Sequence, residues 1–254
     1  MNSWKLLRKI VGKRAMSSYD VKYNYNSPRF KTISHHLPKD STIDKYSNDS
    51  RANIYAKKLF NPELKTIIFL AHHDVAEPKF HNVLDNTASI SNMIELFNRL
   101  QNKELSINVI MAFSDGEELA NFVDPGSVLL AKKIKNKDFG EVLEVINLEL
   151  TAFGDYIWGS GNSNILKTNY EIVNVGKIPF SDTSVMLKNG IPSTCLGLFS
   201  HEDFEQVIKT GTCDTWELCH EKQDKFKLAK RKDMSMFVDF LEEYVLRISS
   251  SMKM

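Results

Sequence analysis

Imidazole and carboxylate side chains stand near the ends of the predicted strands, or in the segments that follow them, in this sequence of 254 residues. The residues with this placement are His72, Asp74, Asp85, Glu117, Glu118, Glu149 and His220. A buried carboxylate is costly unless it is paired or bound to a metal. Glu117 and Glu118 are adjacent acids that repel each other, and a cation relieves that repulsion. The pattern therefore predicts a metal site.

Five of these residues have the types and the number that suit two metal ions. They are His72, Asp85, Glu118, Glu149 and His220. Zinc takes imidazole nitrogen and carboxylate oxygen in such mixtures. Five ligands are too many for a single catalytic zinc with an open position, but they suit two ions about 3.5–4 Å apart that share one carboxylate. The same ligand types accept manganese or cobalt.

Several of these residues also have an ordinary structural interpretation. A lone histidine at a strand end, such as His72, is more often structural than a metal ligand. Asp85 is a good N-cap for the helix predicted to follow it. Glu117 and Glu118 would complement the dipole of a helix in its first turn. These interpretations do not explain, however, why all the residues are expected at one rim of the sheet.

Alternating buried strands and amphipathic helices are expected to position these side chains. Strands are predicted around 29–33 and over 51–60, 65–72, 107–113, 144–150, 156–158 and 193–199. Helices are predicted over 86–102, 126–135, 181–188 and 230–248. The alternation predicts a three-layer α/β/α sandwich with a central mixed, mostly parallel sheet. In such sheets, sites gather beyond the carboxyl ends of the strands.

Length and composition limit the class of protein. The length suits one catalytic α/β domain over 1–254, with 1–50 as a polar, irregular N-terminal extension that packs on it. Lys and Arg number 33 against 32 Asp and Glu, which gives no argument for nucleic acid as a partner. No segment approaches the ~20 apolar residues of a membrane span. No pattern specifies an oligomeric state.

Three cysteines, Cys195, Cys213 and Cys219, form no disulfide framework. They are typical of reduced thiols, so a cytoplasmic location is expected.

The basic N-terminus predicts a short amphipathic helix. Trp4, Leu7 and Val11 supply apolar side chains, and Lys5 and Arg8 supply charge. Such a helix has two common fates, weak attachment to a membrane surface and docking on the body of its own protein. We expect the second, which is the more common.

Seven short motifs, in unbroken order over residues 51–248, resemble those of the aminopeptidases of metallopeptidase family twenty-eight. They are AHHDV (71–75), LDNTAS (84–89), FSDGEELA (113–120), PGSVLLA (125–131), INLEL (146–150), FSDTSVMLKNGIPS (180–193) and CHEKQD (219–224). Any one of them is a weak signal. Seven in order, each in the expected strand or helix context, are specific.

The resemblance implies a fold like that of the zinc-dependent exopeptidases. It also implies an aminopeptidase that uses two zinc ions to cleave N-terminal residues from peptides with a free N-terminus. By the same resemblance, His72, Asp85 and Glu149 hold one metal. The other metal is held by Asp85, Glu118 and His220, so that Asp85 bridges the two.

Two further roles follow from the resemblance. Asp74 would orient His72, because a metal-bound histidine usually donates its second ring nitrogen to such a partner. Glu117 would be the general base that takes a proton from the metal-activated water and passes it to the leaving amine. Members of this family also tend to hold the bridging aspartate before a cis peptide bond, so the bond between Asp85 and Asn86 is expected to be cis.

The sequence departs from the family pattern at three places. Glu149 stands where aspartate is more frequent, and its extra methylene moves the carboxylate outward. Val83 and Leu84 replace the Gly-Ala that usually precedes the bridging aspartate, and Thr183 replaces a histidine that commonly follows Ser-Asp.

Other functions fit the same resemblance. A glutaminyl-cyclase-like acyltransferase with a single zinc shares the fold, but the corresponding segment of that group reads Asp-Ser rather than Asp85-Asn86. A non-catalytic metal-binding relative usually loses ligands or the base, whereas this sequence keeps all of them. Carboxypeptidase or small-amide specificity stays open as well, because one fold hosts many activities.

Overall fold

The protein is described by a computed structural model over residues 1–11, 13, 27–46, 51–58, 60–119, 124–161, 169–176 and 178–253. The strands are β1 (Thr42–Tyr46), β2 (Arg51–Lys58), β3 (Thr66–His72), β4 (Asn108–Ser114), β5 (Val142–Leu148), β6 (Tyr156–Gly161), β7 (Ile172–Asn174) and β8 (Ser193–Phe199). The helices are α1 (Ser3–Ile10), α2 (Pro28–His35), α3 (Ala88–Leu100), α4 (Gly126–Lys135), α5 (Asp182–Lys188), α6 (His201–Thr210), α7 (Asp214–Glu217) and α8 (Arg231–Ser251). Three short helical turns are η2 (Val83–Thr87), η3 (Glu117–Leu119) and η4 (Phe226–Leu228).

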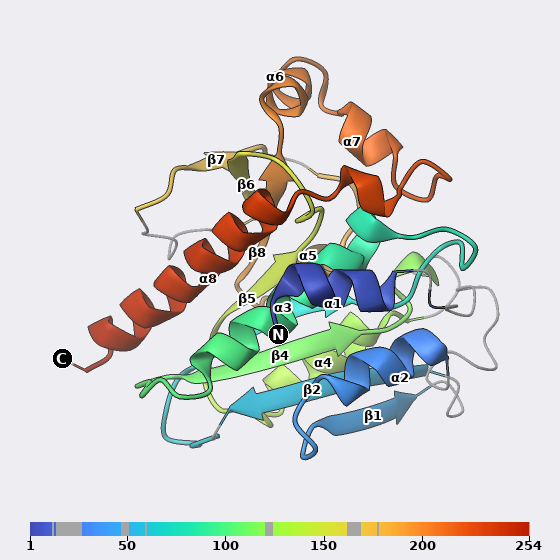
Figure 1. The fold of residues 1–254 in the computed structure, drawn as a ribbon. Coiled ribbons are helices and arrows are strands. Elements are labelled where there is room, and N and C mark those ends of the chain that lie inside the picture. Colours follow the sequence, from blue (N-terminus) through green and yellow to red (C-terminus); the bar gives the residue numbers. More distant parts are fainter. Residues whose placement is uncertain are drawn as a thin grey trace.

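These elements form a mixed eight-stranded sheet in the order β1-β2-β4-β3-β5-β8-β6-β7, with helices on both faces (Figure 1). The four central strands, β4, β3, β5 and β8, are all parallel to their neighbours in that block. The outer pairings β1 with β2, β2 with β4 and β6 with β8 are antiparallel. The fold class predicted from the sequence is therefore confirmed. Because the central strands are parallel, their carboxyl ends meet at one rim.

The central strands are buried on both faces, as their continuous apolar runs predict. In β3, Ile67 and Phe69 pack in the core under α3 and α8, whereas Ile68 and Leu70 pack in the core on the side of α4 and α5. Each fully buried side chain of this size stabilises the fold by roughly 1.5–3 kcal/mol. Two packed faces thus hold the end of β3 in a fixed position.

Helix α1 docks on the body of the protein, as expected. Leu6, Leu7 and Ile10 are at most 1% exposed. The side chain of Asn2 caps the helix by accepting a hydrogen bond from the backbone N–H of Lys5 (3.1 Å). The apolar side of this amphipathic helix is consequently turned inward, and its charged side faces solvent.

The strand predicted around 29–33 is wrong, because this segment is the helix α2. Ser27 caps it by accepting a hydrogen bond from the N–H of Phe30 (3.0 Å), and Pro28 occupies its first turn. Both are start signals of a helix. Within the segment expected to be irregular, residues 42–46 also form the edge strand β1.

Other boundaries shift by a few residues, and some elements were not anticipated. Helix α3 begins at Ala88 rather than Asn86, because η2 precedes it. Strand β5 ends at Leu148, which leaves Glu149 just beyond it. The structure adds β7, α6 and α7 to the predicted elements. Among the described residues, no helix combines the length and the hydropathy needed to cross a bilayer.

Candidate metal centre

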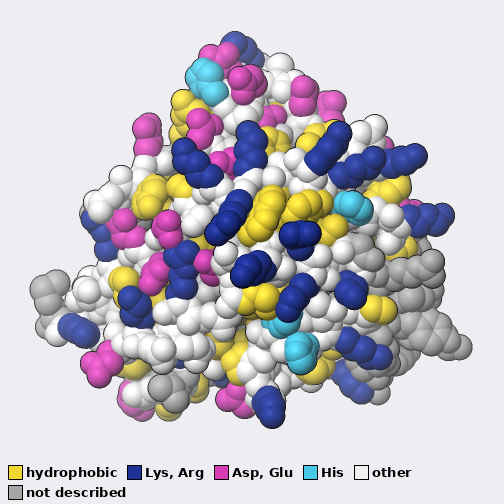
Figure 2. Space-filling view, in the orientation of Figure 1, with side chains coloured by type: hydrophobic (Ala, Val, Ile, Leu, Met, Phe, Trp, Pro, Cys, Tyr) yellow, Lys and Arg dark blue, Asp and Glu magenta, His cyan; other side chains and the backbone are white. Residues whose placement is uncertain are grey.

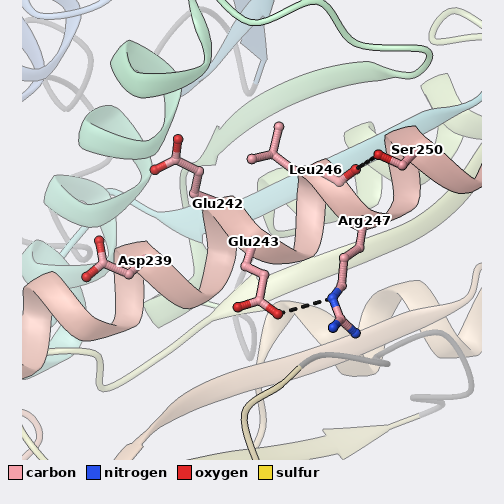
Figure 3. A pocket seen from close by; sticks show the side chains of 6 residues that line it. All are labelled: Asp239, Glu242, Glu243, Leu246, Arg247 and Ser250. Carbon is pink, nitrogen blue, oxygen red and sulfur yellow. Dashed lines mark hydrogen bonds and ion pairs between the residues drawn. The ribbon is translucent and has the colours of Figure 1, made fainter.

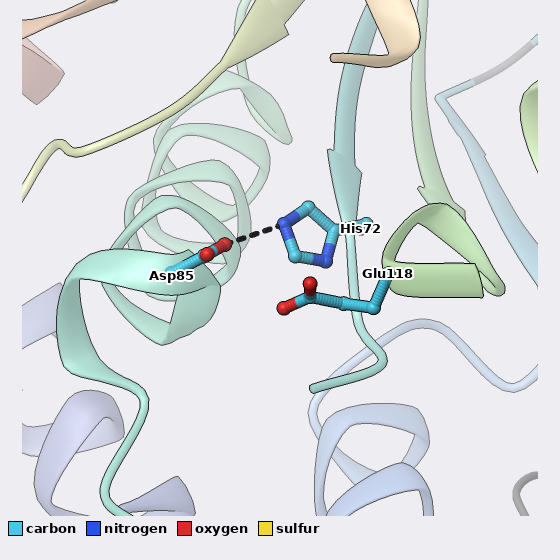
Figure 4. A group of neighbouring side chains, drawn as sticks. All are labelled: His72, Asp85 and Glu118. Atoms are coloured by element: carbon cyan, nitrogen blue, oxygen red, sulfur yellow. Dashed lines mark hydrogen bonds and ion pairs between the residues drawn. The ribbon is translucent and has the colours of Figure 1, made fainter. Parts of the chain in front are cut away.

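The rim formed by the central strands brings the predicted ligands together. His72 is the last residue of β3 and pairs in register with Ser114 at the end of β4. Glu118 lies on η3, immediately after β4, and Glu149 follows β5. Asp85 lies on η2, directly before α3, and faces His72 (Figure 4). Atoms of His72, Asp85 and Glu118 that could bind a metal all lie within 4.8 Å of one another.

The two oxygens of Asp85 face two different histidines. Its Oδ1 lies 2.8 Å from Nε2 of His72, and its Oδ2 lies 3.0 Å from Nε2 of His220. Glu149 Oε2 stands 3.7 Å from Nε2 of His72. Glu118 Oε2 stands 2.9 Å from Nε2 of His220. The carboxylate of Asp85 therefore separates two groups of donor atoms, each with one imidazole and one further carboxylate.

The spacing and the charges of these residues suit bound metal ions. Tetrahedral zinc with ligands at about 2.0–2.1 Å separates neighbouring donor atoms by about 3.3 Å. The separations above range from 2.8 to 3.7 Å around that value. Three carboxylates share the site with two imidazoles, and burial raises the pKa of Glu149 to about 8 and also raises that of Glu118. Such an excess of buried acid is what bound cations would relieve.

Backbone geometry at η2 presents Asp85 to both histidines. The peptide bond between Asp85 and Asn86 is cis, as expected. The carboxylate of Asp224 accepts hydrogen bonds from the backbone N–H of Leu84 (2.9 and 3.1 Å) and, at 3.4 Å, from that of Asp85. Asp224 lies four residues after His220, so one loop supplies both a predicted ligand and the residue that fixes Asp85.

Two asparagine side chains hold Glu149. Asn86 Nδ2 donates to Oε2 (2.5 Å), and Asn147 Nδ2 donates to Oε1 (3.1 Å). The backbone of Glu149 also lies close to β8. A Cβ at Gly197 would lie 2.2 Å from the carbonyl oxygen of Glu149, so only glycine fits at this position of β8. The longer side chain of Glu149, compared with aspartate, is thereby fixed toward His72.

Asp74 contacts both halves of the site. Its Oδ1 lies 3.3 Å from Nδ1 of His72, an ion-pair distance without the alignment of a hydrogen bond. Its two oxygens also accept from the backbone N–H groups of Glu117 (3.3 Å) and Glu118 (3.2 Å). Asp74 is fully buried and therefore ties the ring of His72 to the turn η3.

Glu117 stands apart from the other acids because its carboxylate has no hydrogen bond to a described residue. It lines a cavity of about 590 Å³ next to His72. Burial raises the pKa of Glu117 well above its usual value, and the charge of Glu149 adds to the rise, although His72 opposes it. A carboxylate whose pKa lies closer to neutrality is a better general base or acid.

Aromatic and aliphatic side chains form the other wall of this cavity. Its apolar lining comprises Leu150, Trp158, Ile178, Pro179, Phe180 and Trp216. Trp158 stacks on Phe199 (ring centroids 5.1 Å apart) and meets Trp216 edge-on (6.4 Å). The cavity therefore joins a charged floor to an apolar wall, as small-molecule sites commonly do.

Two residues of the site have left-handed backbone conformations. Leu150 has φ 56° and His220 has φ 65°. Such conformations are uncommon in non-glycine residues and cluster at functional sites, where the surrounding structure holds them.

A comparison with protein families decides to which family the chain belongs. Residues 53–245, more than half of the chain, match the sequence profile of peptidase family M28. The chain belongs to peptidase family M28. The family expected from the seven motifs is therefore confirmed. A comparison of the sequence with curated proteins finds no match.

Solved structures with the fold of this M28 chain include both peptidases and a cyclase. The LapA aminopeptidase of Legionella pneumophila matches with a TM-score of 0.72 and 14% identity, over 98% of this chain and 69% of that one. A glutaminyl cyclase of Porphyromonas gingivalis matches with a TM-score of 0.71 and 15% identity, over 97% of each chain. BSAP, a zinc aminopeptidase from Bacillus subtilis, matches with a TM-score of 0.60 and 14% identity, over 78% of this chain and 50% of that one. At these identities the likeness shows the fold alone.

Several residues around the site were not anticipated from the sequence. Buried Arg29 donates from Nε to the carbonyl of His73 (2.9 Å) and from Nη1 to Thr87 Oγ1 (2.7 Å), and burial lowers its pKa to about 10. Asp182, by contrast, belongs to the motif at 180–193 and was expected near the site; it is buried and accepts from Ser114 Oγ (2.5 Å). The sequence also assigned no role to the aromatic wall or to Lys188, which lines the cavity too, although Phe180 and Lys188 lie within the motif at 180–193.

Proposed function

We propose that this M28 chain is a co-catalytic two-zinc aminopeptidase that removes N-terminal residues from peptides. The observation that carries the proposal is the position of Asp85 between His72 and His220, with Glu149 on one side and Glu118 on the other. His72, Asp85 and Glu149 would hold one ion. Asp85, Glu118 and His220 would hold the second.

Glu117 is the residue of this chain that moves protons. When bound, zinc supplies Lewis acidity for a carbonyl oxygen and for water. Glu117 takes a proton from the attacking water and returns it to the leaving amine. Asp74 holds the backbone of Glu117 in place, so that the carboxylate stays next to His72 on the floor of the cavity.

Specificity for the end of a peptide follows from the cavity. Glu149 lies on the cavity surface, and its carboxylate is available to a protonated α-amine. The apolar wall around Trp158, Phe180 and Trp216 suits a large apolar first side chain. A peptide with a blocked N-terminus has no α-ammonium group to donate to Glu149 and is expected to be a poor substrate.

A panel of peptides tests this proposal. Zinc-loaded protein is expected to cleave peptides that begin with Leu or Phe and to leave their N-acetylated forms intact. Peptides that begin with Asp test the apolar wall. Cleavage of the acetylated peptides at the same rate would contradict an aminopeptidase.

A glutaminyl-cyclase-like acyltransferase is the second candidate. The similarity in size and fold to the Porphyromonas gingivalis cyclase, which covers 97% of both chains, favours it. Two observations favour two metals instead. Asn86, rather than serine, follows Asp85, and His72 lies beside Asp85. Cyclisation of peptides that begin with Gln, together with one bound zinc per chain, would replace the first proposal with this one.

Zinc binding is expected to release protons and to weaken as the pH falls. The carboxylates of Asp85 and Glu118 raise the pKa of His220 to about 11 in the metal-free site. A group with a raised pKa is protonated below that value, so zinc has to displace a proton from His220 at neutral pH. We expect the zinc affinity to fall about tenfold per pH unit for each proton displaced.

Calorimetric titration of metal-free protein in buffers with different heats of ionisation counts these protons. A zinc affinity that is constant between about pH 6 and about pH 8 would show that the histidine nitrogens are not ligands.

Lys188 is expected to favour short peptides with a free C-terminal carboxylate. It lines the cavity, is exposed, and has no ion pair with a described residue. For dipeptides, Lys188→Ala should raise KM about five- to tenfold, which corresponds to the loss of an exposed charge-assisted contact. Dipeptide amides should be unaffected. Lys135→Ala, an exposed lysine whose ammonium contacts Asn189 (2.7 Å), is the matched control. An equal change for dipeptides and their amides would remove this role.

A further inference from the structure

Opposite charges are segregated along this chain although its net charge is close to zero. The first 40 residues contain nine Lys and Arg against two Asp and Glu, whereas the remaining 214 contain 24 against 30. The N-terminal segment therefore carries an excess of positive charge, and the rest of the chain an excess of negative charge.

Helices α1 and α2 gather part of this charge around one groove. A hollow of about 690 Å³ between them is lined by the cationic or titratable side chains of Arg8, Lys9, Lys13, Lys31, His35 and His36. No carboxylate lines it, and none of the six makes an ion pair with a described residue. Burial and then the charge of Lys9 lower the pKa of His36, in accord with a positive potential in the groove.

A second basic segment adjoins the first. Trp4 of α1 packs on Phe226 of η4, with ring centroids 4.7 Å apart. Phe226 lies between Lys225 and Lys227, and Lys5 follows Trp4. Figure 2 shows dark blue side chains spread over α1, α2 and the segment that leads into α8, while magenta side chains gather around α6 and at the left edge of the view.

In another charged groove of this protein, acidic and basic side chains form ion pairs. The hollow along α8 is lined by Asp239, Glu242, Glu243 and Arg247, among others (Figure 3). Glu243 pairs with Arg247 (3.1 Å). Asp239 and Glu242 pair with Arg99 (2.5 and 3.2 Å). The groove between α1 and α2 has no such internal partners among the described residues.

We propose that the face formed by α1, α2 and residues 225–227, the basic face, is a docking surface for an anionic lipid bilayer. It presents lysine and arginine side chains from three segments, without intervening acids in its groove. Trp4 and Phe226 lie among them, both half-buried. Partly buried aromatic rings among basic residues suit the headgroup level of a membrane.

The structure favours a bilayer over nucleic acid as the occupant. Binding of single strands relies on aromatic rings whose faces are open for base stacking. Trp4 and Phe226 instead lie against each other, tilted by 48°. The apolar side of α1 is buried in the body, so docking is electrostatic rather than by insertion of the helix. Such attachment is reversible and sensitive to salt.

Flotation with vesicles tests the proposal on the full chain. Binding is expected to vesicles of phosphatidylcholine with about 30% phosphatidylserine at about 0.1 M salt, and not to phosphatidylcholine alone. It should be lost at about 0.5 M salt, where screening is stronger. The triple variant Lys5→Glu, Lys9→Glu, Lys31→Glu should lower partitioning at least 100-fold, because each basic residue contributes a factor of about five.

A matched variant separates the basic face from net charge. Lys132→Glu, Lys135→Glu, Lys137→Glu makes the same change in exposed residues of α4 and the turn after it, on the opposite side of the sheet, and should bind like the wild type. Equal loss in both variants, or binding to neutral vesicles, would overturn the proposal. Binding of single-stranded RNA without binding of anionic vesicles would assign the face to nucleic acid instead. Thermal unfolding of both variants, expected to match the wild type, checks that each is folded.

Discussion

Glu117→Gln is expected to lower kcat by about 10³-fold, while the zinc content stays at its wild-type level. Glutamine keeps the shape of the side chain but cannot accept the proton of the attacking water. Glu117 is not among the proposed ligands, and its carboxylate has no hydrogen bond to a described residue, so the metal centre should be undisturbed. Its side chain lies on the cavity surface next to His72.

Kinetics on a Leu dipeptide together with elemental analysis of the same sample checks this result. Glu104→Gln, an exposed acid on the loop that leads into the amino end of β4, opposite the rim, is the matched control and should be unchanged. A Glu117→Gln enzyme with turnover within a few-fold of the wild type would remove Glu117 as the base. Loss of zinc in that variant would instead make it a ligand.

Asp85→Asn is expected to remove most of both zinc ions and to abolish activity. The two oxygens of Asp85 face Nε2 of His72 and Nε2 of His220, so one substitution weakens both metal positions. His72→Ala and His220→Ala each remove a ligand from one position only. We therefore expect about two zinc ions per chain in the wild type, about one in each histidine variant and fewer than one in Asp85→Asn.

Elemental analysis after gel filtration distinguishes these outcomes. Asp155→Asn, an exposed aspartate directly before β6 that does not line the cavity, is the control and should keep the wild-type content. Equal losses in all three site variants would indicate one shared metal position, as in the alternative cyclase.

The sequence predicts the central strands well because burial on both faces leaves an unambiguous pattern. The segments at 65–72 and 107–113 are continuous apolar runs, and they became β3 and β4 with shifts of one residue. Parallel strands place their carboxyl ends together, so the residues after them meet. This explains why the sequence alone could assemble His72, Glu118 and Glu149.

The prediction from sequence fails in two places where a local signal departs from the pattern around it. Ser27 and Pro28 begin the helix α2 where a strand is expected around 29–33. The turn η2 was also hidden, because Asp85 and Asn86 have non-helical backbone angles inside a segment that otherwise suits a helix.

The wall of the cavity could not be predicted from sequence for a different reason. Trp158 belongs to β6, Phe180 precedes α5, and Trp216 belongs to α7. No regular spacing in the sequence relates the three residues. They meet only in the folded protein, where β6 pairs with β8 in an antiparallel register and all three side chains line one cavity. Arg29 was equally hidden, since a buried arginine in a polar segment has no sequence signature.

Anomalous diffraction at the zinc absorption edge, from crystals grown with zinc, tests the central claim most directly. The account predicts two peaks about 3.5–4 Å apart, one beside His72 and Glu149 and one beside Glu118 and His220, with Asp85 between them. A single peak, or two peaks that Asp85 does not contact, would contradict it.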